Sequence, residues 1–151
     1  MTTIAVSGPL KISRMLITIG TVIYGIIPPF VDLTETHVFH PDWTEHARFH
    51  MVWLLGTNTG LAFLAFYLLW KKGENLLLRI RAAGVLGLFI LGGFFLSVLT
   101  RPIYGGALVD EQGGVPSIPI FGGLDANVTV FTPALALVIL GLWLSARGTT
   151  E

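Results

Sequence analysis

The sequence predicts an all-α fold: one transmembrane domain in which four membrane-spanning helices form a bundle. Hydrophobic residues make up 53% of the 151 residues and charged residues only 12%, whereas about a quarter of the residues of a soluble domain are charged. The apolar residues gather in four largely uncharged runs, whose lengths approach the roughly 20 residues that a helix needs to cross a bilayer. We therefore expect a multi-pass integral membrane protein with the lipid bilayer as its main partner.

The four expected helices cover about residues 15–31, 49–70, 80–99 and 128–144. Lys11 and Arg14 precede the first run, as in a secretory signal, but the run ends at Pro28-Pro29 without a small-residue cleavage site. We therefore interpret this run as a retained helix. Glycines in the third run allow close helix packing. The fourth run contains Pro133, which a membrane helix tolerates because neighbouring groups can satisfy the freed carbonyl.

Basic residues predict the orientation of the bundle, because short loops rich in Lys and Arg stay in the cytoplasm. Seven of the nine Lys and Arg residues flank what would be one side of the membrane: Lys11, Arg14, Lys71, Lys72, Arg79, Arg81 and Arg147. Arg48 and Arg101 fall on the other side. Both termini are therefore expected in the cytoplasm, and the two longer connections, 32–48 and 101–127, on the outer face.

Composition also excludes several classes of function. The formal net charge is zero, so no general positive field attracts nucleic acid, which we exclude as a partner. The chain has no cysteine, which rules out a thiolate nucleophile, a zinc–cysteine site and an iron–sulfur cluster. Any metal would need histidine, carboxylate or backbone oxygen ligands.

All four histidines fall within the first outer connection and the start of the helix that follows: His37, His40, His46 and His50. Four acidic residues share this stretch: Asp32, Glu35, Asp42 and Glu45. Polar groups are costly near hydrocarbon unless they are paired or solvated, so this clustering predicts a functional site.

Helical periodicity arranges part of this cluster. Thr44 is a plausible N-cap of the second helix, which makes His46 and His50 i,i+4 neighbours. At about 100° per residue, five residues share one stripe that runs into the membrane: His46, His50, Trp53, Thr57 and Gly60. Arg48 lies nearly opposite, and Asn58 lies off the stripe, where it could bond between helices. The stripe predicts an aromatic-lined pocket for a lipophilic molecule.

We favour acid–base catalysis on a lipophilic small molecule that enters from the membrane: isomerisation, epoxide opening, hydration or cyclisation. His46 or His50 would carry protons, an acid would orient the histidine, and an arginine would hold an anionic group. The proposed catalytic residues are His46, His50, Asp32, Glu35, Arg48 and Arg101. The proposed substrate contacts are Trp53, Thr57, Asn58, Tyr104 and Trp43.

One alternative is a non-catalytic metal-binding or metal-delivery protein. His46 and His50 could both reach one zinc, iron or copper ion, and His37 and His40 could complete the site. The Glu of the metalloprotease pattern is absent, however, and four histidines are too few for the di-iron sites of membrane desaturases. We therefore favour no cofactor.

Other interpretations also stay open. The chain could be an accessory subunit of a larger membrane complex, or it could form a homo-oligomer, because so small a bundle offers little internal volume. The loop histidines could cap carbonyl groups, Trp43 could be an interfacial anchor and Arg48 could pair with Glu45.

The connection 101–127 has three Gly-Gly pairs, three prolines and several apolar residues. Long loops in compact proteins are usually functional or disordered, and the apolar content here favours an ordered lid over the outer mouth of the bundle. Asp110, Glu111 and Asp125 could supply a carboxylate to the histidine cluster, or they could be solvated loop acids.

The block His37-x-x-His40-Pro-x-Trp43-x-x-His46-Ala-Arg48-x-His50 resembles a group of short four-helix membrane proteins of unassigned function. This resemblance covers one loop and the start of one helix, and it implies the fold but no activity. The overall plan is also analogous to membrane isomerases of the sterol isomerase type and to membrane-bound terpene cyclases, whose motifs the sequence does not contain.

Overall fold

A computed structural model describes residues 7–108 and 125–148, and every regular element in these residues is a helix. In chain order the helices are α1 (Gly8–Gly25), α2 (Ile27–Asp32), α3 (Glu45–Trp70), α4 (Leu76–Tyr104) and α5 (Ala126–Ser145). Within this part of the chain, four stretches are long and apolar enough to cross a membrane: α1 together with α2, α3, α4 and α5. The predicted all-α, four-helix fold is confirmed.

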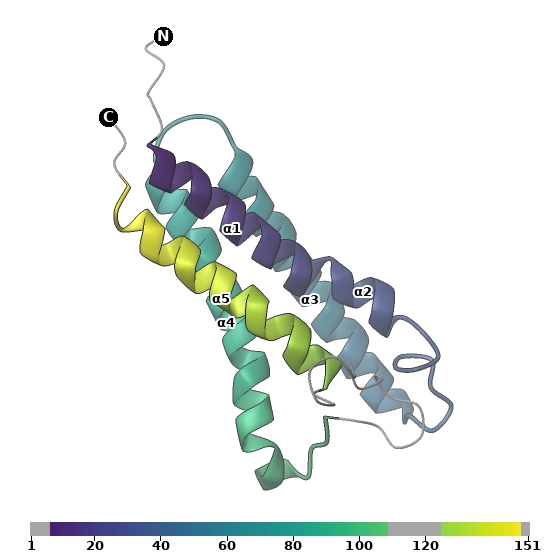
Figure 1. The fold of residues 1–151 in the computed structure, drawn as a ribbon. Helices are drawn as coiled ribbons and strands as arrows, with labels where there is room; N and C mark the ends of the chain where they lie inside the picture. Colours follow the sequence, from purple (N-terminus) through teal and green to yellow (C-terminus); the bar gives the residue numbers. More distant parts are fainter. Residues whose placement is uncertain (1–6, 109–124, 149–151) are drawn as a thin grey trace.

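The helices form a bundle with two chemically different ends (Figure 1). The start of α1, the end of α5 and the turn between α3 and α4 lie at one end, which we call the basic end because it carries the seven basic residues grouped above. We call the opposite end the histidine end. It holds α2, the loop 33–44 and the start of α3, and the last turns of α4 diverge from the other helices there (Figure 1).

Small residues allow α1 and α5 to pack closely. A Cβ atom at Gly141 would lie 2.6 Å from Cγ1 of Ile17 and 3.1 Å from the backbone oxygen of Ser13, so only a glycine fits without movement. The hydroxyl of Ser13 donates a 2.7 Å hydrogen bond to the carbonyl of Gly141 at this crossing. Helices in a membrane associate through such small-residue contacts and interhelical hydrogen bonds, because the surrounding lipid is as apolar as the helices and the hydrophobic effect does not drive them together.

Two prolines break the first membrane span and create a contact with α3. Pro29 has no N–H, so the carbonyl of Gly25 lacks its usual i+4 donor, and the chain breaks between α1 and α2. The hydroxyl of Thr59 on α3 donates to this freed carbonyl at 3.1 Å. We expected Asn58 to bond between the helices, but the described hydrogen bond comes from its neighbour, because Thr59 faces Gly25.

All four spans extend beyond the limits expected from hydropathy. The first begins at Gly8 rather than residue 15, the second at Glu45 rather than 49, and the third covers Leu76–Tyr104 rather than 80–99. The fourth gains about two residues at its start and one at its end. Hydropathy marks the part of a helix that hydrocarbon can cover, whereas caps and charged turns extend the helix into the interface.

Candidate functional site

The loop before α3 is fastened to the first turns of that helix. The hydroxyl of Thr44 accepts a 3.2 Å hydrogen bond from the backbone N–H of Ala47, which confirms the predicted N-cap. Nη2 of Arg48 donates to the carbonyl oxygens of His40 at 2.8 Å and Pro41 at 3.4 Å. Arg48 therefore ties the loop to α3, and its guanidinium contacts backbone oxygens rather than the two histidines of the helix.

His46 and His50 meet on the exposed face of α3. Their Nε2 atoms lie 3.0 Å apart, and their ring planes are nearly perpendicular at 87°. A hydrogen bond between two imidazole nitrogens needs one donor and one acceptor. In a hydrogen bond between the two neutral rings, one Nε2 would therefore donate and the other would accept, and the tautomer of each ring decides which.

An apolar hollow begins beside this pair. It has a volume of about 440 Å³ and is lined by His50, Trp53, Leu54 and Thr57. The rings of His50 and Trp53 stack at 5.9 Å between centroids. Its four lining residues all belong to α3 and are exposed, so the hollow is an open depression on one face of this helix, and three of the residues predicted from the helical stripe line it.

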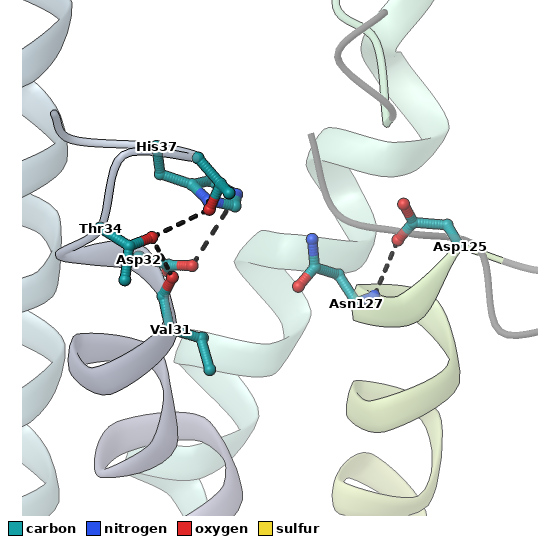
Figure 2. Close-up of polar contacts among 7 residues, drawn as sticks. Val31, Asp32, Thr34, His37, Asp125 and Asn127 are labelled. Atoms are coloured by element: carbon teal, nitrogen blue, oxygen red, sulfur yellow. Dashed lines mark hydrogen bonds and ion pairs between the residues drawn. The ribbon is translucent and has the colours of Figure 1, made fainter. Parts of the chain in front are cut away.

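A second polar group follows α2, as Figure 2 shows. Nε2 of His37 lies 3.9 Å from Oδ1 of Asp32, and both side chains are largely buried, at 15% and 14% exposure. We expected Asp32 to orient His46 or His50, but its carboxylate faces His37. The histidine end therefore contains two separate polar groups: Asp32 with His37, and His46 with His50 on α3.

Hydrogen bonds assign the ring proton of His37. Thr34 donates its hydroxyl proton to the carbonyl of Val31 at 2.8 Å, so Thr36 donates to Thr34 at 2.9 Å. The oxygen of Thr36 must then accept the 2.9 Å bond to Nδ1 of His37, which carries the proton. The other ring nitrogen of His37, Nε2, consequently faces Asp32 (Figure 2).

His40 has a structural position. It is 6% exposed, and its Nδ1 accepts a 3.2 Å hydrogen bond from the backbone N–H of Asp42. Among residues 7–108 and 125–148, no group of three or more His, Cys, Asp or Glu side chains is placed to hold a metal ion. The four-histidine site considered from the sequence is thus not assembled there.

The start of α5 faces the histidine end. Oδ1 of Asp125 accepts hydrogen bonds from the backbone N–H groups of Asn127 at 2.9 Å and Val128 at 3.1 Å, which makes Asp125 the N-cap of the helix. The side chain of Asn127 extends from α5 towards the Asp32–His37 pair (Figure 2). Asp110, Glu111 and most of the predicted lid lie outside the described residues.

Residues 16–150 match a family of unknown function, DUF6640. The chain belongs to this family. No curated protein and no solved structure matches it significantly. Both polar groups of the histidine end and the apolar hollow fall within the part that matches DUF6640, so the family's domain contains the whole candidate site.

Two further candidates of this DUF6640 chain lie on the diverging end of α4 (Figure 1). Nη1 of Arg101 donates at 3.3 Å to the carbonyl of Val98, which Pro102 leaves without its usual i+4 donor. The hydroxyl of Tyr104 donates to the carbonyl of Ser97 at 2.8 Å. Both side chains therefore contact their own helix and are not brought to the histidine pair.

The remaining candidates lie on the loop. Glu35 is exposed in the turn after α2. Trp43 presents its ring edge-on to His37, with centroids 6.0 Å apart. Sequence reasoning missed the two threonines that hold His37, although Thr-x-Thr directly before a histidine is a pattern in which hydroxyl groups often bond locally.

Proposed function

We propose that this protein is a multi-pass membrane enzyme that performs acid–base chemistry on a lipophilic small molecule at the histidine end. The contact between His46 and His50 at the edge of the apolar hollow carries this proposal. His50 lines the hollow, and its Nε2 lies 3.0 Å from that of His46. While Nε2 of His50 is bonded to His46, the other ring nitrogen of His50, Nδ1, would be the one to exchange a proton with a substrate in the hollow.

The proton balance of such a pair suits isomerisation. His50 takes a proton from a carbon of the substrate as a base, and the resulting imidazolium returns a proton to another carbon of the same molecule, so no co-reactant is consumed. His46 stabilises the imidazolium by accepting a hydrogen bond from it. Hydration, epoxide opening and cyclisation begin instead with proton donation from the pair to an alkene or an epoxide oxygen.

The surroundings of the pair support a lipophilic substrate. Trp53 is 61% exposed and Leu54 53% exposed, and with Thr57 they continue from His50 along a helix that can cross the membrane. A molecule dissolved in the bilayer could therefore reach the pair laterally. The Asp32–His37 contact adds a second polar pair at the same end.

Deuterium incorporation tests the reaction class even when the product is unidentified. Purified protein in lipid nanodiscs would be incubated in D₂O with a sterol, an unsaturated fatty acid, an isoprenoid alcohol and a terpene epoxide, followed by mass spectrometry. We expect carbon-bound deuterium in one of these classes, and a loss of roughly 100-fold or more in His50→Gln, as for other general acid–base residues. Lys11→Gln, an exposed residue at the basic end that belongs to neither proposed site, is the control. Equal incorporation by wild type and His50→Gln would overturn the proposal.

The same distance also favours a metal-binding function as a second candidate. Two imidazole nitrogens at about 2.0–2.1 Å from one tetrahedral zinc ion lie roughly 3.3 Å apart, so a small movement of the two Nε2 atoms, which are 3.0 Å apart, would suffice. Zinc, iron or copper could therefore bind between His46 and His50, with water or substrate completing the coordination. Elemental analysis by mass spectrometry of wild type and a His46→Ala/His50→Ala variant separates the two candidates: stoichiometric metal that disappears in the variant favours the metal.

A further inference from the structure

Positive charge is concentrated at the basic end of the bundle. Seven of the nine Lys and Arg residues lie there, and Glu74 is the acidic residue among the described residues of this end. Where the structure describes the chain, the single ion pair is between His37 and Asp32 at the opposite end. The cations of the basic end are thus not neutralised by carboxylates of the described residues.

Arg14 and Trp70 form one corner of this end. The guanidinium carbon of Arg14 lies 4.1 Å from the centre of the Trp70 ring, and the indole N–H of Trp70 donates to Thr18 at 3.2 Å. Nε of Arg14 is buried and has no hydrogen-bond partner within the described part of the chain. Lys71 and Lys72 follow Trp70 directly and are exposed. The corner combines three cations with a tryptophan held by two contacts.

Arg147 and Trp143 repeat this pairing on α5, with the guanidinium carbon 3.5 Å from the ring centre. Two other arginines have structural partners instead. Arg79 donates to the carbonyls of Lys71 and Gly73, which end α3 and begin the turn. Arg81 donates to the carbonyl of Ser145 at 3.3 Å. The cations that remain are therefore Arg14 and Arg147 beside the tryptophans, Lys71 and Lys72 in the turn, and Lys11 at the start of α1.

We propose that the Arg14–Trp70 corner, with Lys71 and Lys72, binds the phosphate headgroup of an anionic phospholipid. Tryptophan concentrates at the headgroup level of membranes, and clusters of basic residues next to a span attract anionic lipids. Arginine matches phosphate oxygens with paired N–H donors, and Arg14 is only partly buried and pairs with no carboxylate of the described residues. This inference rests on the proposed insertion in a bilayer, but not on the proposed reaction.

Native mass spectrometry of the detergent-purified protein tests the site with phosphatidylglycerol and phosphatidylcholine as probes. We expect wild type to retain phosphatidylglycerol preferentially. Each basic residue near a membrane surface contributes about fivefold to the affinity for anionic lipid, so Arg14→Gln/Lys71→Gln should weaken retention by about 25-fold. Arg101→Gln, which removes one charge at the histidine end, is the matched control and should retain the preference.

Two further arms keep the test decisive. If the double variant does not fold, wild type in 50 and 500 mM salt replaces it, and only phosphatidylglycerol binding should fall at high salt. Inorganic phosphate at the same concentration as the lipid should not compete. Equal retention of the two lipids, an equal loss in Arg101→Gln, or full competition by inorganic phosphate would each overturn the proposed lipid site, whatever the outcome of the deuterium experiment.

Discussion

Replacing Gly141 by alanine should destabilise the bundle at the crossing of α1 and α5. The new methyl group would lie 2.6 Å from Cγ1 of Ile17 and 3.1 Å from the backbone oxygen of Ser13, whereas apolar atoms pack best at about 3.5–4.0 Å. The helices must therefore separate by several tenths of an ångström, and overpacking of this kind costs about 1–3 kcal/mol. The movement also stretches the Ser13–Gly141 hydrogen bond, and interhelical bonds in membranes contribute about 0.6 kcal/mol on average.

Alanine also favours a helix over glycine by about 1 kcal/mol, so the net loss in the free energy of unfolding should be about 1–2 kcal/mol. Unfolding by sodium dodecyl sulfate, followed by circular dichroism in detergent, measures this difference. Gly56→Ala is the matched control, because a Cβ atom there meets nothing within 4 Å and should leave the protein equally or more stable. If both variants unfold at the same mole fraction of detergent, α1 and α5 do not pack through Gly141.

Three other substitutions test separate contacts by the same unfolding measurement. Thr44→Ala should lose about 1 kcal/mol because α3 loses its N-cap, whereas Thr44→Ser should be close to neutral; equal stability of the two would contradict the cap. Thr59→Val should lose about 0.6 kcal/mol, and at most about 1.7 kcal/mol, because the Gly25 carbonyl is left without a donor, and no loss would contradict this contact. Asp125→Ala should lose about 1 kcal/mol and Asp125→Asn less, since an amide oxygen still caps α5; the reverse order would refute the role of Oδ1.

The spans and the start of α3 could be predicted because their physical causes are local. Apolar runs of membrane-crossing length follow directly from composition and order, and Thr44 caps α3 through an atom three residues from its partner. The His46–His50 contact is equally local, since residues four apart lie on one helix face. The part of the site that lies on α3 could therefore be predicted from helix geometry alone.

Contacts that depend on the path of a loop or on the packing of two helices could not be predicted. Asp32 faces His37 because of the path that the loop takes. Arg48 can hold this loop because the turn exposes the carbonyl of His40 to it. Hydropathy indicated a helix up to Val31 but could not show that Thr59 satisfies the carbonyl freed by Pro29. The path of the loop and the packing of the helices decide which residues meet in these contacts. The periodicity of the sequence carries no information about either.

The state of the histidine pair is the most direct test of the central claim that His46 and His50 share a proton beside an apolar hollow. Nitrogen-15 NMR of protein labelled at histidine, in nanodiscs and without added metal, distinguishes protonated from unprotonated ring nitrogens, and His46→Gln and His50→Gln assign the signals. We expect one Nε2 to carry a proton and the other to lack one, with each variant changing the signal of the remaining partner. Two Nε2 atoms in the same state, with signals that do not respond to loss of the other histidine, would contradict the acid–base pair.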